Sequence, residues 1–328
     1  MSTQKVRQDP GAMERQLNRR RKAARNRKLG SFAVVGVIVA AAIVAAVVAR
    51  EESRKPASSP TAEPGVAGQA LSIVDIGTGE TTSFTAPIST SGFDTTLDGS
   101  MVTYTDFDGN GNDQVFVMDA DGSNQRQLTH SPGGVTLAQT PPQWSPDGSL
   151  VAYWATIPTG SVQLFVVRLS DSTSTRVTDE PSDVYEGGWA SDRSFVFSIS
   201  NPRSAYPLLA RSIDIGTKET TTIARDVSNP EVSPDGTRIA FLSYFRPEGE
   251  TWLSLMNIDG TGRQKIQQVS SYSSFPKWSP DSGRVAFFDT AAKSGSGTYV
   301  YDLGSRETRF LTAGTIESWI DSDHMLVS

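Results

Sequence analysis

The chain has 328 residues, of which 37% are hydrophobic, no cysteine and a formal net charge of -6. The absence of cysteine excludes a disulfide scaffold, a thiolate metal site and a cysteine nucleophile. The charge is unevenly divided, because residues 1–50 carry a net +9 and residues 51–328 carry -15. The acidic part argues against nucleic acid as a partner, since phosphate binding needs Lys and Arg. The division itself indicates that the two parts lie in different environments.

An uncharged span over residues 29–49 predicts one transmembrane helix. Its core reads FAVVGVIVAAAIVAAVVA. A span of about 21 residues makes roughly 31 Å of helix, which matches the hydrocarbon core of a bilayer. Residues 1–28 form a basic tail, so the N-terminus is expected in the cytoplasm and the rest of the chain outside, in a single-pass cell-membrane protein. The alternative is a signal peptide that is cleaved after Ala49.

Residues 50–69 follow the span and are rich in Pro, Ser, Ala and Glu, without an apolar period. This composition predicts a flexible linker. The remaining residues, 70–328, are expected to form one domain that the linker holds away from the bilayer.

A short phrase recurs through this domain with a period of about 41–49 residues, which is typical of propeller blades. In its full form, Pro presets φ, Asp accepts local backbone hydrogen bonds, and Gly takes a left-handed conformation that closes a hairpin. A β-rich run follows each copy. The clear copies are WSPDG at 144–148, VSPDG at 232–236 and WSPDS at 278–282, and degenerate copies lie at 96–99, 189–193 and 319–323.

Each repeat contains four predicted strands, which make one blade of an all-β, six-bladed β-propeller. The last copy begins at Trp319, so the C-terminal residues supply only two strands of a blade. Residues 71–76 and 81–85 predict two further strands before the first copy. These N-terminal strands are expected to complete the sixth blade and close the ring without exposed edges. A flat β-sandwich with regular turns is the alternative.

The repeat resembles the TolB-type β-propeller family, above all in the stretch YTDFDGNGNDQVFVMDADGSNQRQLT at 104–129. The resemblance implies a propeller that binds components of the cell envelope. Other similar propellers cap serine peptidases of the prolyl-oligopeptidase type. Two features depart from these patterns: residues 51–69 are too short for the α/β domain that precedes the propeller in TolB, and no Gly-x-Ser-x-Gly elbow is present.

Few residues indicate chemistry. The chain has two histidines, His130 and His324, which are expected in different blades, and no catalytic residue is predicted. Asp106, Asp108 and Asn110 match the first half of a calcium loop, but the twelfth position is Val117 rather than an acid. Calcium is therefore a weak candidate, and an ordinary hairpin loop is the alternative. No other cofactor is expected.

The repetitive turns are expected on one face of the propeller and loops of varied sequence on the other. Tyr and Arg on rigidly mounted loops are common binding anchors. The function predicted is therefore that of a membrane-anchored, extracytoplasmic module that binds another envelope protein or a cell-wall component, with lipid contact through residues 29–49. The alternative is an envelope hydrolase or lyase acting on saccharide or peptide at the channel mouth. The predicted binding face comprises Tyr185, Glu186, Arg203, Tyr206, Arg246 and Tyr272.

Overall fold

The computed structural model describes residues 69–327, except 87–92, 97, 121, 131–135, 139, 201–207, 246–248, 271–275 and 291–294. The predicted tail and membrane span, and all but the last residue of the predicted linker, lie outside the described residues. Among the residues that are described, no helix is both long and apolar enough to cross a bilayer.

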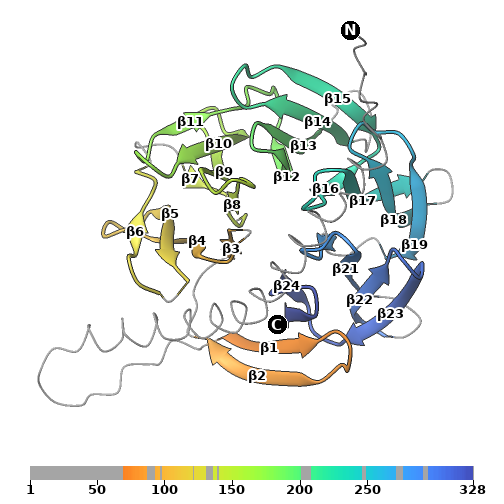
Figure 1. Cartoon of the computed structure of the whole chain (residues 1–328). Coiled ribbons are helices and arrows are strands. Elements are labelled where there is room, and N and C mark those ends of the chain that lie inside the picture. The colour runs from red at the N-terminus through yellow and green to blue at the C-terminus, as the bar shows by residue number, and fades with distance from the viewer. Residues whose placement is uncertain are drawn as a thin grey trace, which may run out of the picture.

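Six antiparallel sheets surround a central axis, as Figure 1 shows, and form the predicted six-bladed propeller. Blades 1 to 5 follow the order of the chain, and blade 6 combines strands from the two ends of the domain. Blade 1 contains β3 (Phe93–Thr95), β4 (Met101–Phe107), β5 (Asp113–Asp119) and β6 (Arg126–Gln127). Blade 2 contains β7 (Thr136–Leu137), β8 (Gln143–Trp144), β9 (Leu150–Thr156), β10 (Val162–Arg168) and β11 (Ser174–Arg176). Blade 3 contains β12 (Val184–Ser191), β13 (Ser194–Ser200), β14 (Leu208–Asp214) and β15 (Thr220–Arg225). Blade 4 contains β16 (Ser228–Val232), β17 (Arg238–Phe245), β18 (Glu250–Asn257) and β19 (Gln264–Val269). Blade 5 contains β20 (Lys277–Trp278), β21 (Arg284–Asp289), β22 (Gly297–Asp302) and β23 (Glu307–Thr312). Blade 6 contains β1 (Gln69–Asp75), β2 (Thr81–Ala86), β24 (Ile316–Trp319) and β25 (His324–Val327).

The recurring phrase forms a closed turn between the first two strands of a blade. In blade 2 the Ser145 hydroxyl donates to Asp147 at 2.7 Å, and the Gly148 N–H donates to the Ser145 carbonyl at 2.9 Å. Gly148 has φ 71°, the left-handed value that was predicted for this position. Ser233 and Ser279 repeat the hydroxyl contact with their own Asp partners. The phrase therefore satisfies its own polar groups.

The tryptophan of the phrase also joins neighbouring blades. In blades 3, 5 and 6 its indole N–H donates to a backbone carbonyl on the innermost strand of the preceding blade, whereas the buried indole N–H of Trp144 in blade 2 makes no such bond. This contact explains why Trp recurs beside a turn that does not itself require it. The three pairs are Trp189 with Gln143 at 3.2 Å, Trp278 with Glu231 at 3.0 Å and Trp319 with Lys277 at 3.0 Å.

The hydrophobic core lies between adjacent blades rather than within a single sheet. Between blades 2 and 3, Trp154 meets Phe195 edge-on at 5.8 Å, and Trp189 meets the same ring at 5.2 Å. Trp154 and Phe195 are both fully buried. Each blade is thus stabilised largely by its neighbours, so the ring gains stability when it closes.

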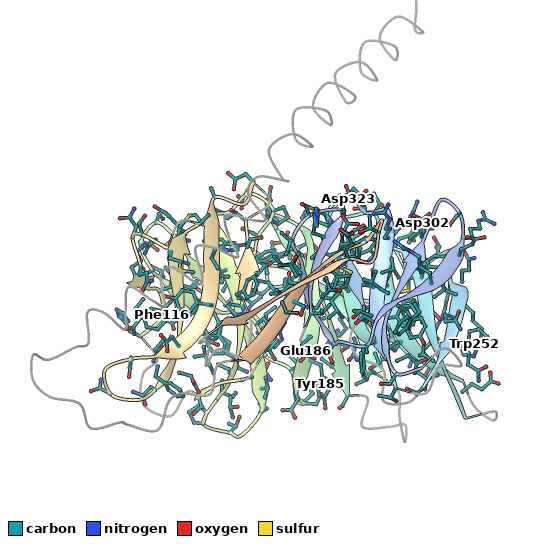
Figure 2. All side chains as sticks on the ribbon, turned by 90° about the horizontal axis from the view of Figure 1, so that it is seen from below. Phe116, Tyr185, Glu186, Trp252, Asp302 and Asp323 are labelled. Atoms are coloured by element: carbon teal, nitrogen blue, oxygen red, sulfur yellow. The ribbon has the colours of Figure 1, made fainter. Side chains whose placement is uncertain are left out.

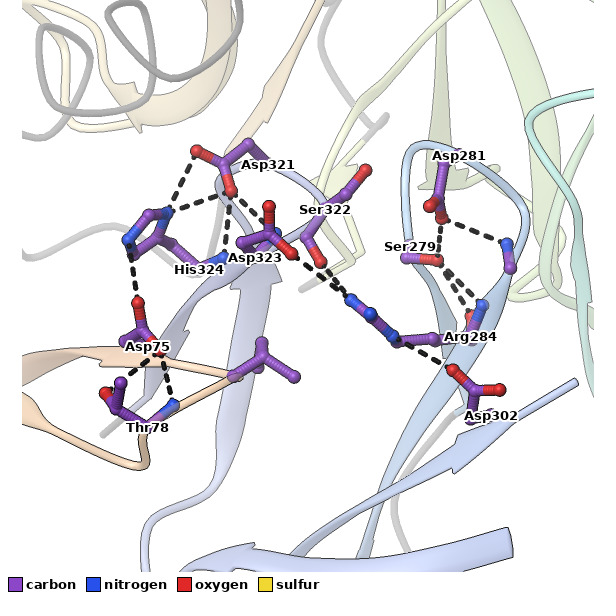
Figure 3. A network of polar contacts seen from close by, with 12 residues as sticks. Asp75, Thr78, Ser279, Asp281, Arg284, Asp302, Asp321, Ser322, Asp323 and His324 are labelled. Carbon is purple, nitrogen blue, oxygen red and sulfur yellow. Dashed lines mark hydrogen bonds and ion pairs between the residues drawn. The ribbon is translucent and has the colours of Figure 1, made fainter. Parts of the chain in front are cut away.

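Closure of the ring by the N-terminal strands is confirmed. Strand β1 pairs with β25 from Ser72 opposite Val327 to Asp75 opposite His324, and β2 pairs with the other side of β1. Figure 3 shows the polar seam beside this joint: the His324 ring contacts Asp321 at 3.0 Å and Asp75 at 3.5 Å. The N- and C-terminal parts of blade 6 are therefore joined by both backbone and side chains.

The two faces of the ring carry different connections between strands. Figure 2 shows Asp302 and Asp323, which belong to short turns, on one face, and Tyr185, Glu186 and Trp252 on the opposite face. The face with the phrase turns is called the turn face below. The opposite face, where the second strand of each blade meets the third and where successive blades are connected, is called the variable-loop face.

Candidate functional site: the variable-loop face and the central channel

Tyr185 and Glu186 lie together at the start of β12, the innermost strand of blade 3. The register of β12 against β13 shifts between Tyr185 and Gly187, so Glu186 is the extra residue of a β-bulge. A Cβ on Gly187 would lie 1.8 Å from the Val196 carbonyl oxygen, which no side chain tolerates. Glycine at this position therefore allows the bulge that places Glu186.

Tyr185 is held by its own blade and Glu186 by the neighbouring blade 2. The Tyr185 hydroxyl lies 3.1 Å from the Ser200 hydroxyl, and the tyrosine remains 36% exposed. Glu186 accepts a hydrogen bond from the Thr140 hydroxyl at 3.4 Å. Next to this contact, the side-chain amide of Gln143 on β8 donates to the Gly187 carbonyl at 3.0 Å. An aromatic ring and a carboxylate are thus presented side by side on a fixed support.

The structure brings these two predicted binding residues together and leaves the others untested. Arg203, Tyr206, Arg246 and Tyr272 lie outside the described residues. They stay predictions.

The predicted calcium residues lie in and beside the hairpin between β4 and β5. Asp108 accepts hydrogen bonds from the backbone N–H groups of Asn110 at 2.8 Å and Asn112 at 3.0 Å. The bond from Asn112 is the main reason that the pKa of Asp108 lies below its usual value. Asp106 accepts a bond from the N–H of Phe107 at 2.8 Å. The loop therefore closes on itself, as the hairpin alternative requires, while calcium binding stays a prediction.

A metal site of another kind is not evident in the described part of the chain, where no three His, Asp or Glu side chains are grouped to hold an ion. The two histidines lie in blades 1 and 6, as expected. The His130 ring contacts the Thr129 carbonyl and the Gln127 amide, and His324 belongs to the closing seam. Neither ring is placed beside a serine or threonine nucleophile by the contacts it makes.

A charged cluster in the channel was not predicted. Asp94 on β3, Glu231 on β16 and Lys277 on β20 belong to the innermost strands of blades 1, 4 and 5. Each lies near the end of its strand, just before the turn phrase, so the cluster is nearer the turn face than Tyr185 and Glu186 are. Two acids and one base from three blades therefore share the channel.

The channel raises the pKa of both acids. Burial raises the pKa of Asp94 to about 6, although the backbone N–H of Trp144 donates to its carboxylate at 2.8 Å. Burial also raises the pKa of Glu231 to about 7; the positive charge of Lys277 opposes this shift and the charge of Asp94 adds to it. The three groups thus interact electrostatically, and both carboxyls exchange protons near neutral pH.

One signal in the sequence could have identified this cluster. Glu231 and Lys277 stand immediately before the first residue of the phrase, and Gln143 and Ser318 hold the same position in other blades. Because strand side chains alternate, the neighbour of a buried Trp on an innermost strand faces the channel. The position just before the phrase, compared across the aligned repeats, therefore identifies the residues that face the channel.

The comparison with known families agrees with the repeat and the ring. A family model described as the TolB β-propeller domain matches residues 70–280. This chain belongs to the TolB β-propeller family.

The chain is also similar to one curated protein and to several solved structures. The Tol-Pal system protein TolB of Alcanivorax borkumensis is 31% identical over 94 residues, which cover 28% of this chain and 21% of that relative's length. A solved putative TolB from Agrobacterium tumefaciens is 18% identical, with a TM-score of 0.60 over 79% of this chain and 96% of its own. An oligogalacturonate lyase in complex with manganese is 20% identical, with a TM-score of 0.51 over 77% of this chain and 76% of its own. At these identities the two structures show the fold alone.

The TolB-family propeller therefore carries two chemically distinct regions along one axis. The variable-loop face offers an aromatic ring beside a carboxylate, which suits hydrogen bonding and stacking with a partner. The channel offers carboxyls that are partly protonated near neutral pH. The first arrangement suits binding, and the second is available for proton exchange.

Proposed function

We propose that this chain is a membrane-anchored, extracytoplasmic propeller that binds another envelope protein or a cell-wall component. In this proposal residues 1–28 lie in the cytoplasm, residues 29–49 cross the cell membrane, and residues 50–69 link the membrane to the propeller at 70–328. The uneven charge and the uncharged span support the anchor. Membership of the TolB family and similarity to a protein of the Tol-Pal system support an envelope role.

The contrast between the two faces carries the proposal. On the turn face, carboxylates such as those of Asp147 and Asp235 accept hydrogen bonds from their own turns. On the variable-loop face, Phe107 is 54% exposed and Tyr185 is 36% exposed. Exposed aromatic side chains on rigid strand ends are frequent anchors of protein interfaces. The variable-loop face is thus better suited than the turn face to hold a partner.

The point at which the chain enters the propeller supports the same face. Gln69 pairs with Ala86 at one end of β1, and Asp75 at the other end pairs with His324, which directly follows a turn of the turn face. Strand β1 therefore begins at the variable-loop face. The linker joins the propeller there, so the proposed anchor brings this face close to the membrane.

Capture of partners from the native envelope tests the proposal. The full-length chain, the double variant Tyr185→Ala/Glu186→Gln and a turn-face control, Ser305→Ala, would be expressed at equal levels. We expect the double variant to recover a partner at least about tenfold less well, since losing an interface anchor costs on the order of 1–2 kcal/mol. The control should recover it fully. Equal recovery by all three proteins would refute this binding face.

A second candidate, a hydrolase or lyase acting on saccharide or peptide, is favoured by one observation. Asp94 and Glu231 interact in the channel and have pKa values of about 6 and 7, which suit a general acid and base. In this case Glu231→Gln should abolish turnover of an envelope saccharide or peptide and leave partner capture unchanged. The binding proposal predicts the reverse for Tyr185→Ala/Glu186→Gln.

A further inference from the structure

The outer edge of blade 6 differs from the outer edges of the other five blades. Each blade ends in an outermost strand whose outer side has no partner strand among the described residues. Such edges invite pairing with foreign strands, and proteins protect them with short length, charged side chains or β-bulges. An outermost strand that lacks all of these features is therefore open to a partner strand.

Five of the six edges carry at least one protecting feature. Strands β6 and β11 have two and three residues, and each contains an arginine. Strands β15, β19 and β23 contain charged residues, and each pairs with its neighbour through a shifted register. Their charged residues are Arg225 in β15, Lys265 in β19, and Glu307 and Arg309 in β23.

Strand β2 has none of these features. It spans Thr81–Ala86, reads TTSFTA and contains no charge and no proline. Its register against β1 runs without a shift from Gln69 opposite Ala86 to Val74 opposite Thr81. Thr81, Thr82 and Ser83 are exposed. Figure 1 shows β2 on the outer rim of the ring. It is a neutral edge of six residues without a bulge.

The hydrogen-bond pattern identifies the groups that this edge offers. The Asp75 N–H donates to the Glu80 carbonyl at 2.9 Å, which makes these two residues a hydrogen-bonded pair. Because such pairs alternate along an antiparallel ladder, Thr82, Phe84 and Ala86 bond to β1. The N–H and C=O groups of Thr81, Ser83 and Thr85 therefore point outward. An extended backbone of a partner chain has the spacing to bond all of these groups together in place of water.

We propose that β2 is a docking site for an extended, neutral or basic segment of a partner polypeptide, which adds a fifth strand to blade 6. Charge favours such a partner over a second copy, because residues 51–328 of each copy carry -15 and repel one another. The chain's own linker is a poor occupant, because Pro56, Pro60 and Pro64 interrupt it and cannot donate to a ladder. This site lies on the rim and is separate from the proposed variable-loop interface.

Hydrogen exchange on the full-length protein in detergent tests the proposal. The probes are two synthetic peptides of alternating Thr and Val, one with Lys at both ends and one with Glu at both ends. The Lys-ended peptide should slow exchange at Thr81, Ser83 and Thr85 by about tenfold or more, since their amides would become bonded. The Glu-ended peptide should protect them much less, and the outer amides of β15 and β23 should not change.

Matched variants separate edge pairing from loss of fold. Ser83→Pro removes an outward N–H but leaves the β1–β2 bonds intact, so it should abolish protection of Thr81 and Thr85. Ser83→Ala, which removes only the hydroxyl that lies 2.8 Å from the Ser72 hydroxyl, should retain protection. Thr220→Pro, at an outward position of outer strand β15, should also retain it. All three should melt within about 3 °C of the natural chain.

Four outcomes would overturn the proposal. The first is equal protection of Thr81 and Thr85 in Ser83→Pro, and the second is equal protection by the two peptides. The third is protection before any peptide is added that does not depend on protein concentration, which would show that the chain covers its own edge. The fourth is such protection that grows with concentration, which would show a second copy on β2.

Discussion

At the scale of single residues, Glu231 links the channel to pH. Its ordinary pKa of 4.5 rises to about 7 in the folded protein, chiefly through burial. Between these two values the folded protein binds the proton more tightly than the unfolded chain does, so its stability falls as pH rises. Glu231→Gln removes this loss. We expect the variant to be more stable than the natural chain at pH 8 by about 1–2 kcal/mol and nearly equal at pH 4.5.

Urea denaturation of the full-length protein at several pH values measures this difference. Glu307→Gln, which changes an exposed carboxylate on outer strand β23, is the control and should follow the natural chain. A difference between Glu231→Gln and the natural chain that does not change between pH 4.5 and pH 8 would contradict the titration of Glu231 in the channel.

Gly187 is the other residue on which the site depends. Because a Cβ there would lie 1.8 Å from the Val196 carbonyl, Gly187→Ala must separate β12 from β13. We expect a loss of about 3 kcal/mol or more in the free energy of unfolding, together with a displaced Tyr185. Thermal melting and partner capture would measure the two effects. Gly109→Ala, where a Cβ meets nothing within 4 Å, should be neutral, and equal loss in both variants would refute the argument.

At the scale of the element, the sequence predicted the blades well because each turn closes through its own residues. The Ser, Asp and Gly of a phrase bond within six residues, so their spacing alone specifies the turn. The predicted strands at 71–76 and 81–85 differ from β1 and β2 by at most two residues at either end. The aligned repeats mark Asp94, Glu231 and Lys277 as channel-facing, but that the three meet depends on distant blades closing the ring, which no local pattern shows. The bulge at Glu186 was missed because it depends on the approach of Val196 to Gly187.

Deletion of the N-terminal strands tests ring closure. Removing residues 69–86 takes away Ser72 to Asp75, the residues that pair with β25, and opens the interface between blades 6 and 1. We expect aggregation, since this exposes an apolar strand edge. Removing residues 51–68 should leave the melting temperature of the propeller unchanged. Light scattering and thermal melting compare the two deletions, and equal behaviour would contradict closure through β1.

At the scale of the whole molecule, the point of chain entry determines which face of the propeller lies nearer the membrane, if residues 29–49 cross it. Strand β1 starts at the variable-loop face, and a flexible linker of about 20 residues has an average end-to-end distance of roughly 25 Å. The turn face lies farther away by about the length of a seven-residue strand, roughly 23 Å. The variable-loop face should therefore spend most of its time nearer to the lipid.

Because the chain lacks cysteine, one introduced thiol gives a unique label for measuring this orientation. Thr159→Cys places it on the variable-loop face, in the exposed hairpin after β9, and Ser305→Cys places it on the turn face, in the exposed turn after β22. In vesicles with acceptor dye on the outer lipid, energy transfer should be clearly stronger from position 159 than from position 305. Adding two flexible 20-residue repeats to the linker should reduce the difference. Equal transfer from the two positions in the natural chain would show that the linker does not orient the propeller.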